Sequence, residues 1–373
     1  ELATLSEHWE AARLGAGRSV LVLGEAGIGK SRLALQLREC LTAAQHAWVE
    51  TGATPYTTGT PFHPMIALVS DGLWITRDDS PAEKLAKIAT GLGALSSPEA
   101  VALIADLLGV PSATRLELSP ELQRRRTIEL LVQWTLAVGA VQPMVMLFED
   151  LHWWDPSSLE LLGVLIERSA AAPLLVVLTA RPEFSPPWAA SEHATTLALS
   201  RLSEAETRDV VAALAPEALP VHVVDALVAR SDGVPLYVEE LTRSVLEPDA
   251  ARGADAIPAT LADALMGRLD RLSTAKDLAQ RAAVLGREFP HAQLAAIADR
   301  DDASLRQDLT RLVEAGVLVA RGEPPQATYA FRHALIEEAA YRSLLKRTRQ
   351  QLHARVGTVL ETRFPERAEA EPE

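Results

Sequence analysis

The sequence has little cysteine and no hydrophobic run that is long and unbroken. Cys40 is the only cysteine, which excludes a disulfide framework and a thiolate zinc site and favours a reducing compartment, the cytoplasm. We expect Cys40 itself to pack in the core. The longest apolar run, 131–148, contains two glutamines and Pro143, so it predicts a helix, a turn and a strand rather than a membrane span. The first residues lack a signal-peptide pattern, and a start at Glu1 without Met suggests a fragment.

Basic residues are also scarce. The 36 Lys and Arg against 50 Asp and Glu give a net charge of −14 and a pI of about 5.2. This charge argues against a surface that tracks phosphate backbones, and so against direct DNA binding, and leaves a local basic patch as the alternative. Without a membrane span in the sequence, we expect no membrane partner. A length of 373 residues, with 48% hydrophobic and 23% charged residues, indicates a folded chain of two or three domains. Lysine is rare in this chain, so a lysine within a motif is informative. The lysines are Lys30, Lys84, Lys87, Lys276 and Lys346.

The clearest motif is a phosphate-binding loop. An apolar strand over 19–23 leads into Gly-x-x-x-x-Gly-Lys-Ser, and Leu33, Leu37 and Leu41 then recur at helical spacing. Glycines let the backbone N–H groups of such a loop point at phosphate oxygens, and the helix N-terminus adds favourable partial charge. Lys30 would neutralise β- and γ-phosphates, and the Ser31 hydroxyl would bind Mg²⁺. The predicted nucleotide-binding residues here are Gly24, Glu25, Ala26, Gly27, Ile28, Gly29, Lys30, Ser31 and Arg32.

Two carboxylates follow a second buried strand, 144–148. Glu149 and Asp150 would lie at the carboxyl end of this strand, beside the phosphates. We expect Glu149 to hold Mg²⁺ through water and Asp150 to polarise the attacking water, so both join Ser31 as candidate metal-site residues. Because aspartate is one methylene shorter than glutamate, we predict slow hydrolysis. Asp155 and the proline after it should cap the next helix.

A third buried strand, 174–178, ends in Thr179 and Arg181. Thr179 and Arg181 would sense the γ-phosphate, because guanidinium binds phosphate with two parallel hydrogen bonds. The alternative is an arginine that caps a strand end in solvent. With weaker strands at 47–51 and 196–199, the sequence predicts five parallel strands with helices on both faces.

The remainder of the chain predicts helices and a small hairpin. Ser203 and Glu206 form a capping-box pattern, and a Gly-Val-Pro turn at 233–235 precedes another helix. In a lid over the nucleotide, Gly233 and Pro235 would let the backbone approach the base; otherwise the turn merely joins two helices.

From residue 258, helices are followed by short strands at 316–319 and 327–331, the order of a winged helix. Such a domain either reads DNA or packs on protein, and the acidic balance favours packing.

These motifs together resemble one family. The chain is similar to the NTPase core of the signal-transduction ATPases with numerous domains (STAND), in the branch found in multidomain class III adenylyl/guanylate cyclases and large LuxR-type transcriptional regulators. The expected fold class is α/β, a P-loop NTPase with a parallel five-stranded sheet in an αβα sandwich. The expected domains are the NTPase at 1–200, a helical lid at 201–254, a winged helix at 255–345 and a helical, repeat-like start at 346–373. The resemblance rests on 24–32, 148–155, 179–183, 233–241 and 331–341.

The resemblance implies a switch between ATP and ADP states that uses Mg²⁺. It further implies that His333, in the winged helix, reaches the nucleotide phosphates, and that Pro235 contacts the nucleotide. Family members also self-associate or carry fused effector and helical-repeat sensor domains. Trp154 departs from the small residue expected at its position, and we expect the tryptophan pair there in a core or interface. Two alternatives remain: an AAA-like remodelling ATPase, and an origin-recognition-like DNA-binding NTPase.

The sequence favours adenine over guanine as the base of the bound nucleotide. We find no Asn-Lys-x-Asp motif, which reads guanine, so ATP is preferred to GTP.

The stretch 341–364 is rich in arginine and has no acidic residue until Glu361. We expect it to be a solvated helix face, with a nucleic-acid or membrane patch as the alternative.

Overall fold

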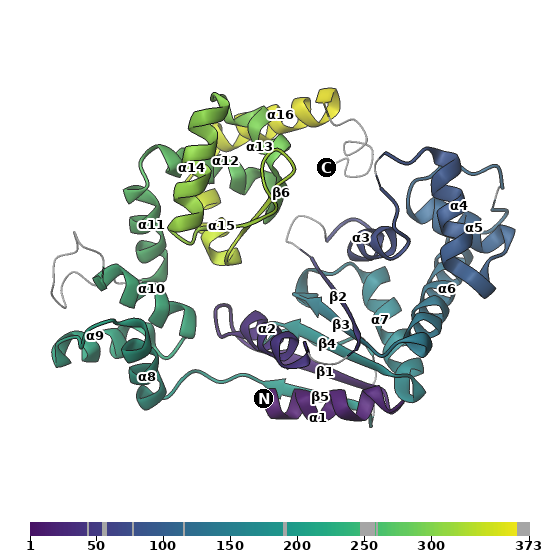
Figure 1. Cartoon of the computed structure of the whole chain (residues 1–373), viewed down its shortest axis with the longest axis horizontal. Coiled ribbons are helices and arrows are strands. Elements are labelled where there is room, and N and C mark those ends of the chain that lie inside the picture. The colour runs from purple at the N-terminus through teal and green to yellow at the C-terminus, as the bar shows by residue number, and fades with distance from the viewer. Residues whose placement is uncertain are drawn as a thin grey trace. The chain divides into compact units, whose positions relative to one another are not determined.

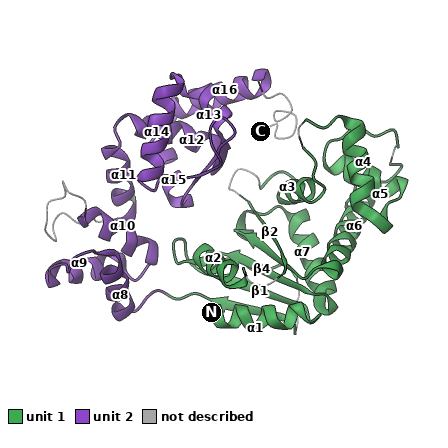
Figure 2. Cartoon of the chain, in the orientation of Figure 1, with its two compact units in different colours: residues 1–200 green, residues 201–373 purple. Residues whose placement is uncertain are grey.

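The computed structural model contains two compact units, residues 1–200 and 201–373 (Figure 2). Each unit has its own hydrophobic cores. The residues that the structure describes are 1–42, 45–53, 58–76, 78–114, 116–188, 192–246, 258 and 260–363.

The first unit is built on a parallel sheet of five strands, in the order β2-β3-β4-β1-β5 (Figure 1). The two apolar strands β3 and β4 lie inside the sheet and are almost wholly buried, which explains their continuous hydrophobic sequence. The edge strands β2 and β5 are half exposed and more polar. The predicted five-stranded parallel sheet is therefore confirmed. The strands are β1 (Arg18–Leu23), β2 (Ala47–Gly52), β3 (Met144–Glu149), β4 (Leu174–Ala180) and β5 (Ala194–Ala198).

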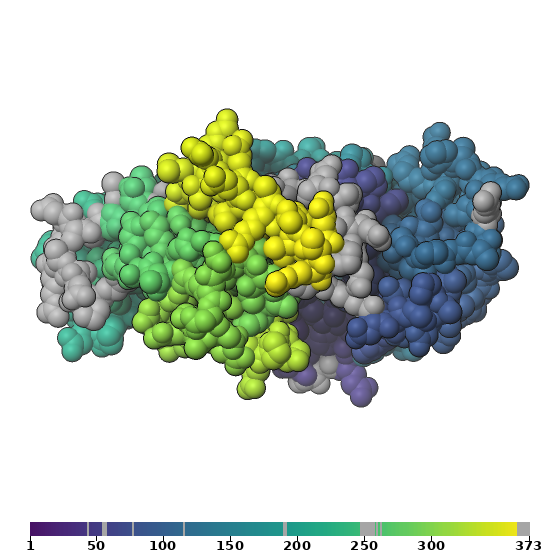
Figure 3. Space-filling model, turned by 90° about the horizontal axis from the view of Figure 1, so that it is seen from above, coloured from purple at the N-terminus to yellow at the C-terminus, as the bar shows by residue number. Residues whose placement is uncertain are grey.

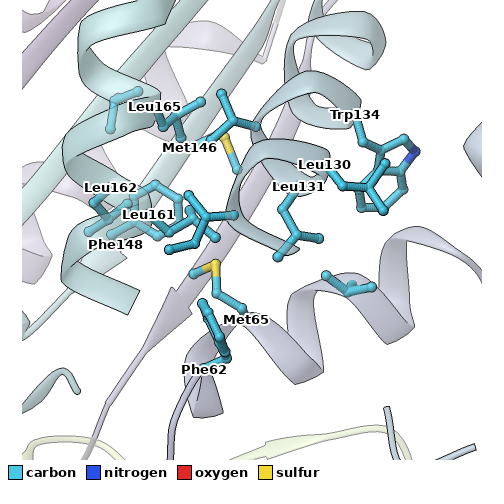
Figure 4. Close-up of a cluster of buried hydrophobic side chains, with 14 of the residues drawn as sticks. Phe62, Met65, Leu130, Leu131, Trp134, Met146, Phe148, Leu161, Leu162 and Leu165 are labelled. Atoms are coloured by element: carbon cyan, nitrogen blue, oxygen red, sulfur yellow. The ribbon is translucent and has the colours of Figure 1, made fainter. Parts of the chain in front are cut away.

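Helices cover both faces of this sheet, as expected for an αβα sandwich (Figure 1). One face packs Val20 and Val22 of β1 against α1 and α2. On the opposite face, Met146 and Phe148 of β3 pack against α3, α6 and α7 (Figure 4). The helices of this unit are α1 (Leu2–Arg13), α2 (Lys30–Leu41), α3 (His63–Gly72), α4 (Pro81–Leu92), α5 (Pro98–Leu107), α6 (Pro120–Val141) and α7 (Pro156–Arg168), with short 3₁₀ turns η1 (Gly93–Leu95), η2 (Leu151–Trp153) and η3 (Ser169–Ala171).

One prediction for this unit is wrong, because Cys40 is exposed rather than packed in the core. The helix α2 turns Ala34, Leu37 and Leu41 toward the sheet, and these residues are three or four positions apart. Cys40 precedes the last of them by one residue and therefore lies about 100° away around the helix. Helix α1, which packs Trp9 into the core at 1% exposure, was not predicted from the sequence.

The second unit is mainly helical. The predicted capping box is confirmed, since the Ser203 side chain accepts from the Glu206 backbone N–H and the Glu206 carboxylate accepts from Ser203. A three-stranded antiparallel sheet in the order β6-β8-β7 lies among the later helices. The sequence predicted β7 and β8 but not the three-residue β6. The elements are α8 (Glu204–Leu214), α9 (Val221–Ser231), α10 (Pro235–Leu246), α11 (Leu261–Arg271), α12 (Thr274–Leu285), β6 (Glu288–Pro290), α13 (His291–Ala298), α14 (Asp302–Glu314), β7 (Leu318–Arg321), β8 (Thr328–Phe331), α15 (Ala334–Arg342) and α16 (Lys346–Arg363).

The C-terminal helix α16 lies on the surface of the second unit, where Figure 3 shows it in yellow. It buries only Leu352 and Val356. This agrees with the expectation of a solvated basic helix. None of the helices in the described residues is both long enough and apolar enough to cross a membrane.

Candidate functional site

The loop between β1 and α2 has the geometry that its glycines predict. Gly27 and Gly29 have φ values of 79° and 110°, which residues with a side chain rarely adopt. A Cβ atom at Gly24 would lie 2.5 Å from the Ile28 side chain, so the loop closes on itself only with glycine there. Ala26 lies within this loop, and Arg32 lies exposed in the first turn of α2. The loop therefore ends at a helix N-terminus whose backbone N–H groups can face an anion.

Lys30 is the first residue of α2 and reaches back over the loop. Its Nζ donates hydrogen bonds to the carbonyl oxygens of Gly24, at 2.8 Å, and Glu25, at 3.0 Å. Burial lowers the pKa of Lys30; Asp150 opposes this shift and Arg181 adds to it. These charges act on Lys30 because β1, β4 and β3 are neighbours whose carboxyl ends meet at one edge of the sheet.

Ser31 and Glu149 are in direct contact. The Ser31 hydroxyl donates a hydrogen bond to Glu149 Oε1 at 2.6 Å, which joins the start of α2 to the end of β3. A hydroxyl and a carboxylate oxygen are the donors that Mg²⁺ prefers, and Mg²⁺ usually completes its shell with water and substrate phosphates. No group of three or more His, Cys, Asp or Glu suited to a metal occurs in the described parts of the chain. The donor set thus fits a magnesium ion that is shared with phosphates.

Asp150 sits in a turn that two neighbours fix. Its φ of 56° places it in the left-handed region, which aspartate tolerates better than most residues. Its backbone N–H donates to Thr179 Oγ1 at 3.0 Å, and Thr179 is buried at 1% exposure. Trp154 donates from Nε1 to the Glu149 carbonyl at 2.9 Å and packs edge-on against Phe148. Trp154 is thus a core residue, and Thr179 holds the backbone of Asp150.

The helix after this turn starts as the sequence predicts. Asp155 caps α7, since its Oδ1 accepts from the backbone N–H groups of Ser157 and Ser158 at 3.0 Å each. The cap fixes the chain direction directly after Trp154.

Arg181 follows β4 and lies against an aromatic ring. Its Cζ is 5.3 Å from the centre of the Trp153 ring, within the range of a cation–π contact. His152 packs against the same tryptophan, with ring centres 4.4 Å apart. The structure therefore groups Arg181 with two aromatic residues from the turn after β3.

His152 was not among the residues that the sequence singled out. Both of its ring nitrogens are buried, and neither has a hydrogen-bond partner among the described residues. Burial, with smaller contributions from Arg181 and Lys30, lowers the pKa of His152 to about 4, so the ring is neutral near pH 7. The one indication in the sequence was its place two residues after Asp150.

The remaining candidates, Pro235 and His333, belong to the second unit. Pro235 begins α10 directly after the Gly233 turn. His333 occupies the N-cap position of α15. Burial lowers the pKa of His333; the carboxylates of Glu239 and Glu240 oppose this shift, and nearby guanidinium groups add to it. His333 thus lies within a group of charged side chains of its own unit.

Comparison with known proteins supports a nucleotide site in the first unit. Residues 1–177 match the model of the AAA ATPase domain. The matched range is just under half of the chain and contains the phosphate loop, so this part of the chain is similar to AAA ATPase domains. The loop at Lys30, the carboxylates after β3 and the strand β4 all fall in the matched range or directly after it.

Two similar proteins extend the comparison to the whole chain. An uncharacterized protein of Rhizobium meliloti (strain 1021) is 32% identical over 379 residues, covering 96% of this chain and 36% of that protein. The crystal structure of a signal transduction ATPase with numerous domains (STAND) with a tetratricopeptide repeat sensor, from Pyrococcus horikoshii, is 13% identical. It has a TM-score of 0.53 and covers 95% of this chain and 44% of that one. The chain thus spans less than half the length of either protein, and the STAND-like resemblance is confirmed at the level of the fold.

Proposed function

We propose that this chain is a slowly hydrolysing ATPase module that switches between ATP and ADP states within a larger regulatory protein. The observation that carries the proposal is the Ser31–Glu149 contact beside Lys30. It joins the start of α2 to the end of β3, and Arg181 follows β4 between them. Cations for phosphate and oxygen donors for Mg²⁺ therefore lie at one edge of the sheet.

The side chains suggest how the site would bind and hydrolyse ATP. Lys30 and the N-terminus of α2 would hold the β- and γ-phosphates. Bound by Ser31 and Glu149, Mg²⁺ would screen the phosphate charge. Asp150 would orient a water whose oxygen bonds to the γ-phosphorus while the bond from this phosphorus to the β–γ bridging oxygen breaks. Asp150 would take the proton of the water, and Arg181 would stabilise the charge on the transferred phosphoryl group.

Slow turnover fits a switch better than a motor. Asp150 has a short side chain, and the left-handed turn and the Thr179 contact fix its backbone. With the backbone held, the carboxylate can approach a water only as far as its short side chain reaches. A long-lived ATP state would give the regulatory protein time to act before hydrolysis resets it.

The second unit would carry the response to the nucleotide. We assign a lid to 201–254, with Pro235 next to the adenine, and a winged helix to 255–345, with His333 reaching the phosphates. Residues 346–373 would begin a helical-repeat region. The proposal includes a fused effector or helical-repeat sensor, or self-association as the active form. The Rhizobium meliloti protein, of which this chain covers 36%, has the length for further domains. With one cysteine in the chain, the cytoplasm is our proposed location.

Binding of DNA through the winged helix is the less favoured function. In this helix–helix–hairpin order α14 takes the place of a recognition helix. Its arginines are paired with its own carboxylates, Arg306 with Asp302 at 2.9 Å and Arg311 with Asp308 at 3.5 Å. These pairs leave little net positive charge for a phosphate backbone.

The test combines the nucleotide that co-purifies with the chain and the steady-state rate of ATP hydrolysis. We expect bound ADP and a turnover below about 0.01 s⁻¹ that is lost in Lys30→Ala. Lys346→Ala, at an exposed position of α16, is the matched control and should match the unaltered chain. An empty site with rapid turnover would favour a remodelling ATPase. Absence of nucleotide binding would refute the proposal.

A further inference from the structure

Arg181 has carboxylates nearby and yet makes no ion pair with any residue that the structure describes. Glu183 follows two residues later, and its charge acts on both Lys30 and His152. Asp150 and Glu149 also act on Lys30. The guanidinium of Arg181 instead contacts the face of the Trp153 ring, with its Cζ 5.3 Å from the ring centre. The positive charge of Arg181 is therefore placed near the phosphate loop without being neutralised by a carboxylate.

The turn that carries Trp153 is held by several contacts. Trp153 is the last residue of the 3₁₀ turn η2, and its backbone N–H donates to the Asp150 carbonyl at 2.9 Å. Leu151 of the same turn is wholly buried, and Trp154 is bonded to the Glu149 carbonyl. His152 supports the ring at a centre distance of 4.4 Å. The turn therefore fixes both Asp150 and the aromatic face on which Arg181 rests.

We propose that Trp153 is a positioning residue that holds Arg181 ready for the γ-phosphate and out of an ion pair with Glu183 or Asp150. This inference rests on the proposed ATPase function. A cation–π contact orients a guanidinium but is weaker than a pair of charge-assisted hydrogen bonds to phosphate. Arg181 can therefore leave the ring for a triphosphate at little cost. An ion pair with a carboxylate would compete with the phosphate and would also occupy the water-orienting group.

A double-mutant cycle tests this role. Trp153→Leu keeps an apolar side chain but removes the aromatic face, and we expect kcat for ATP to fall about tenfold. Affinity for a non-hydrolysable ATP analogue should fall about fivefold while ADP affinity stays unchanged, because ADP lacks the γ-phosphate. Trp153→Phe should recover most of the loss. In an Arg181→Ala background, Trp153→Leu should cause no further change in either kcat or the ATP-to-ADP affinity ratio.

Three outcomes would overturn the inference. They are an unaltered kcat and affinity ratio in Trp153→Leu, an unaltered kcat and ratio in Arg181→Ala, and a loss from Trp153→Leu that is as large without Arg181 as with it. Trp74→Leu is the matched control, because Trp74 is 82% exposed and outside the site. Melting temperature and ADP affinity show whether each variant is folded. If the unaltered chain binds no nucleotide, the proposed function fails and this inference fails with it.

Discussion

The Ser31 hydroxyl donates a 2.6 Å hydrogen bond to Glu149 Oε1, although 118 positions separate the two residues in the sequence. One residue belongs to the helix after the phosphate loop and the other ends a strand on the far side of β4. The parallel sheet brings them together because the carboxyl ends of its strands share an edge. Two oxygens suited to Mg²⁺ thus meet where the phosphate loop ends.

We predict that Ser31→Ala and Glu149→Gln each raise the Mg²⁺ concentration needed for half-maximal ATP binding by about tenfold. The physical reason is the loss of one of two oxygen ligands, or of its charge. ADP affinity measured in EDTA should stay within about twofold, since Lys30 and the loop N–H groups are unchanged. Magnesium titrations followed by a fluorescent nucleotide provide the measurement. An unaltered Mg²⁺ requirement in both variants would show that the ion binds elsewhere.

The sequence predicted the parts of the site that depend on local pattern. The phosphate loop was readable because glycine, Lys30 and Ser31 stand between a buried strand and a helix. The carboxylates at 149–150 were readable because they follow another buried strand. Other features depend on side-chain direction across the fold. The contact of Arg181 with Trp153 joins two strand ends, and no spacing in the sequence encodes it.

The missed elements have similar physical reasons. β6 has three residues and forms only by pairing with β8, so its own sequence holds too few positions for a strand pattern. The exposure of Cys40 follows from the spacing of Leu37 and Leu41, which places Cys40 off the buried face of α2. The prediction that Cys40 packs in the core followed instead the general tendency of cysteine to be buried. The role of Thr179 in holding the Asp150 backbone is a contact between neighbouring strands.

We predict that Asp150→Glu raises the rate of ATP hydrolysis by about threefold to tenfold. The longer side chain brings the carboxylate closer to the attacking water, while the Thr179 contact to the backbone N–H is unaffected. The left-handed φ of 56° disfavours glutamate somewhat, which limits the gain. Steady-state phosphate release provides the measurement, with Asp150→Asn as the inactive control. An unchanged or abolished rate in the glutamate variant would refute the water-orienting role.

Gly233 permits a close approach of two backbones. Its carbonyl accepts from the Leu202 N–H at 2.8 Å, and a Cβ atom at Gly233 would lie 2.3 Å from the Leu202 carbonyl oxygen. Its φ is 69°. We predict that Gly233→Ala lowers the free energy of unfolding by about 2 kcal/mol or more, through this clash and backbone strain.

Denaturant unfolding of the Gly233 variant checks this value. Gly267→Ala in α11 is the matched control, because a Cβ there meets nothing within 4 Å. It should be neutral or stabilising by up to about 1 kcal/mol. Equal effects of the two substitutions would mean that the Leu202 contact contributes nothing.

Glu337 makes the stability of the second unit depend on pH. It is buried in α15 at 8% exposure, and burial raises its pKa to about 7; Arg287 opposes this shift and Glu338 adds to it. The folded unit therefore holds a proton that the unfolded chain has released above about pH 4.5. The stabilisation is complete below about pH 4.5 and is lost as the pH rises through about 7.

We predict that Glu337→Gln, which cannot ionise, removes this loss. We compare the free energy of unfolding of the variant with that of the unaltered chain. The advantage of the variant should be about 2 kcal/mol larger at pH 8 than at pH 5, because only the carboxyl must ionise within the buried site. Urea unfolding across this pH range, followed by the helical signal, provides the measurement. Glu314→Gln removes an exposed carboxylate on α14 of the same unit and serves as the control. A difference between variant and unaltered chain that stays constant with pH would show that Glu337 is already ionised in the folded unit at pH 5.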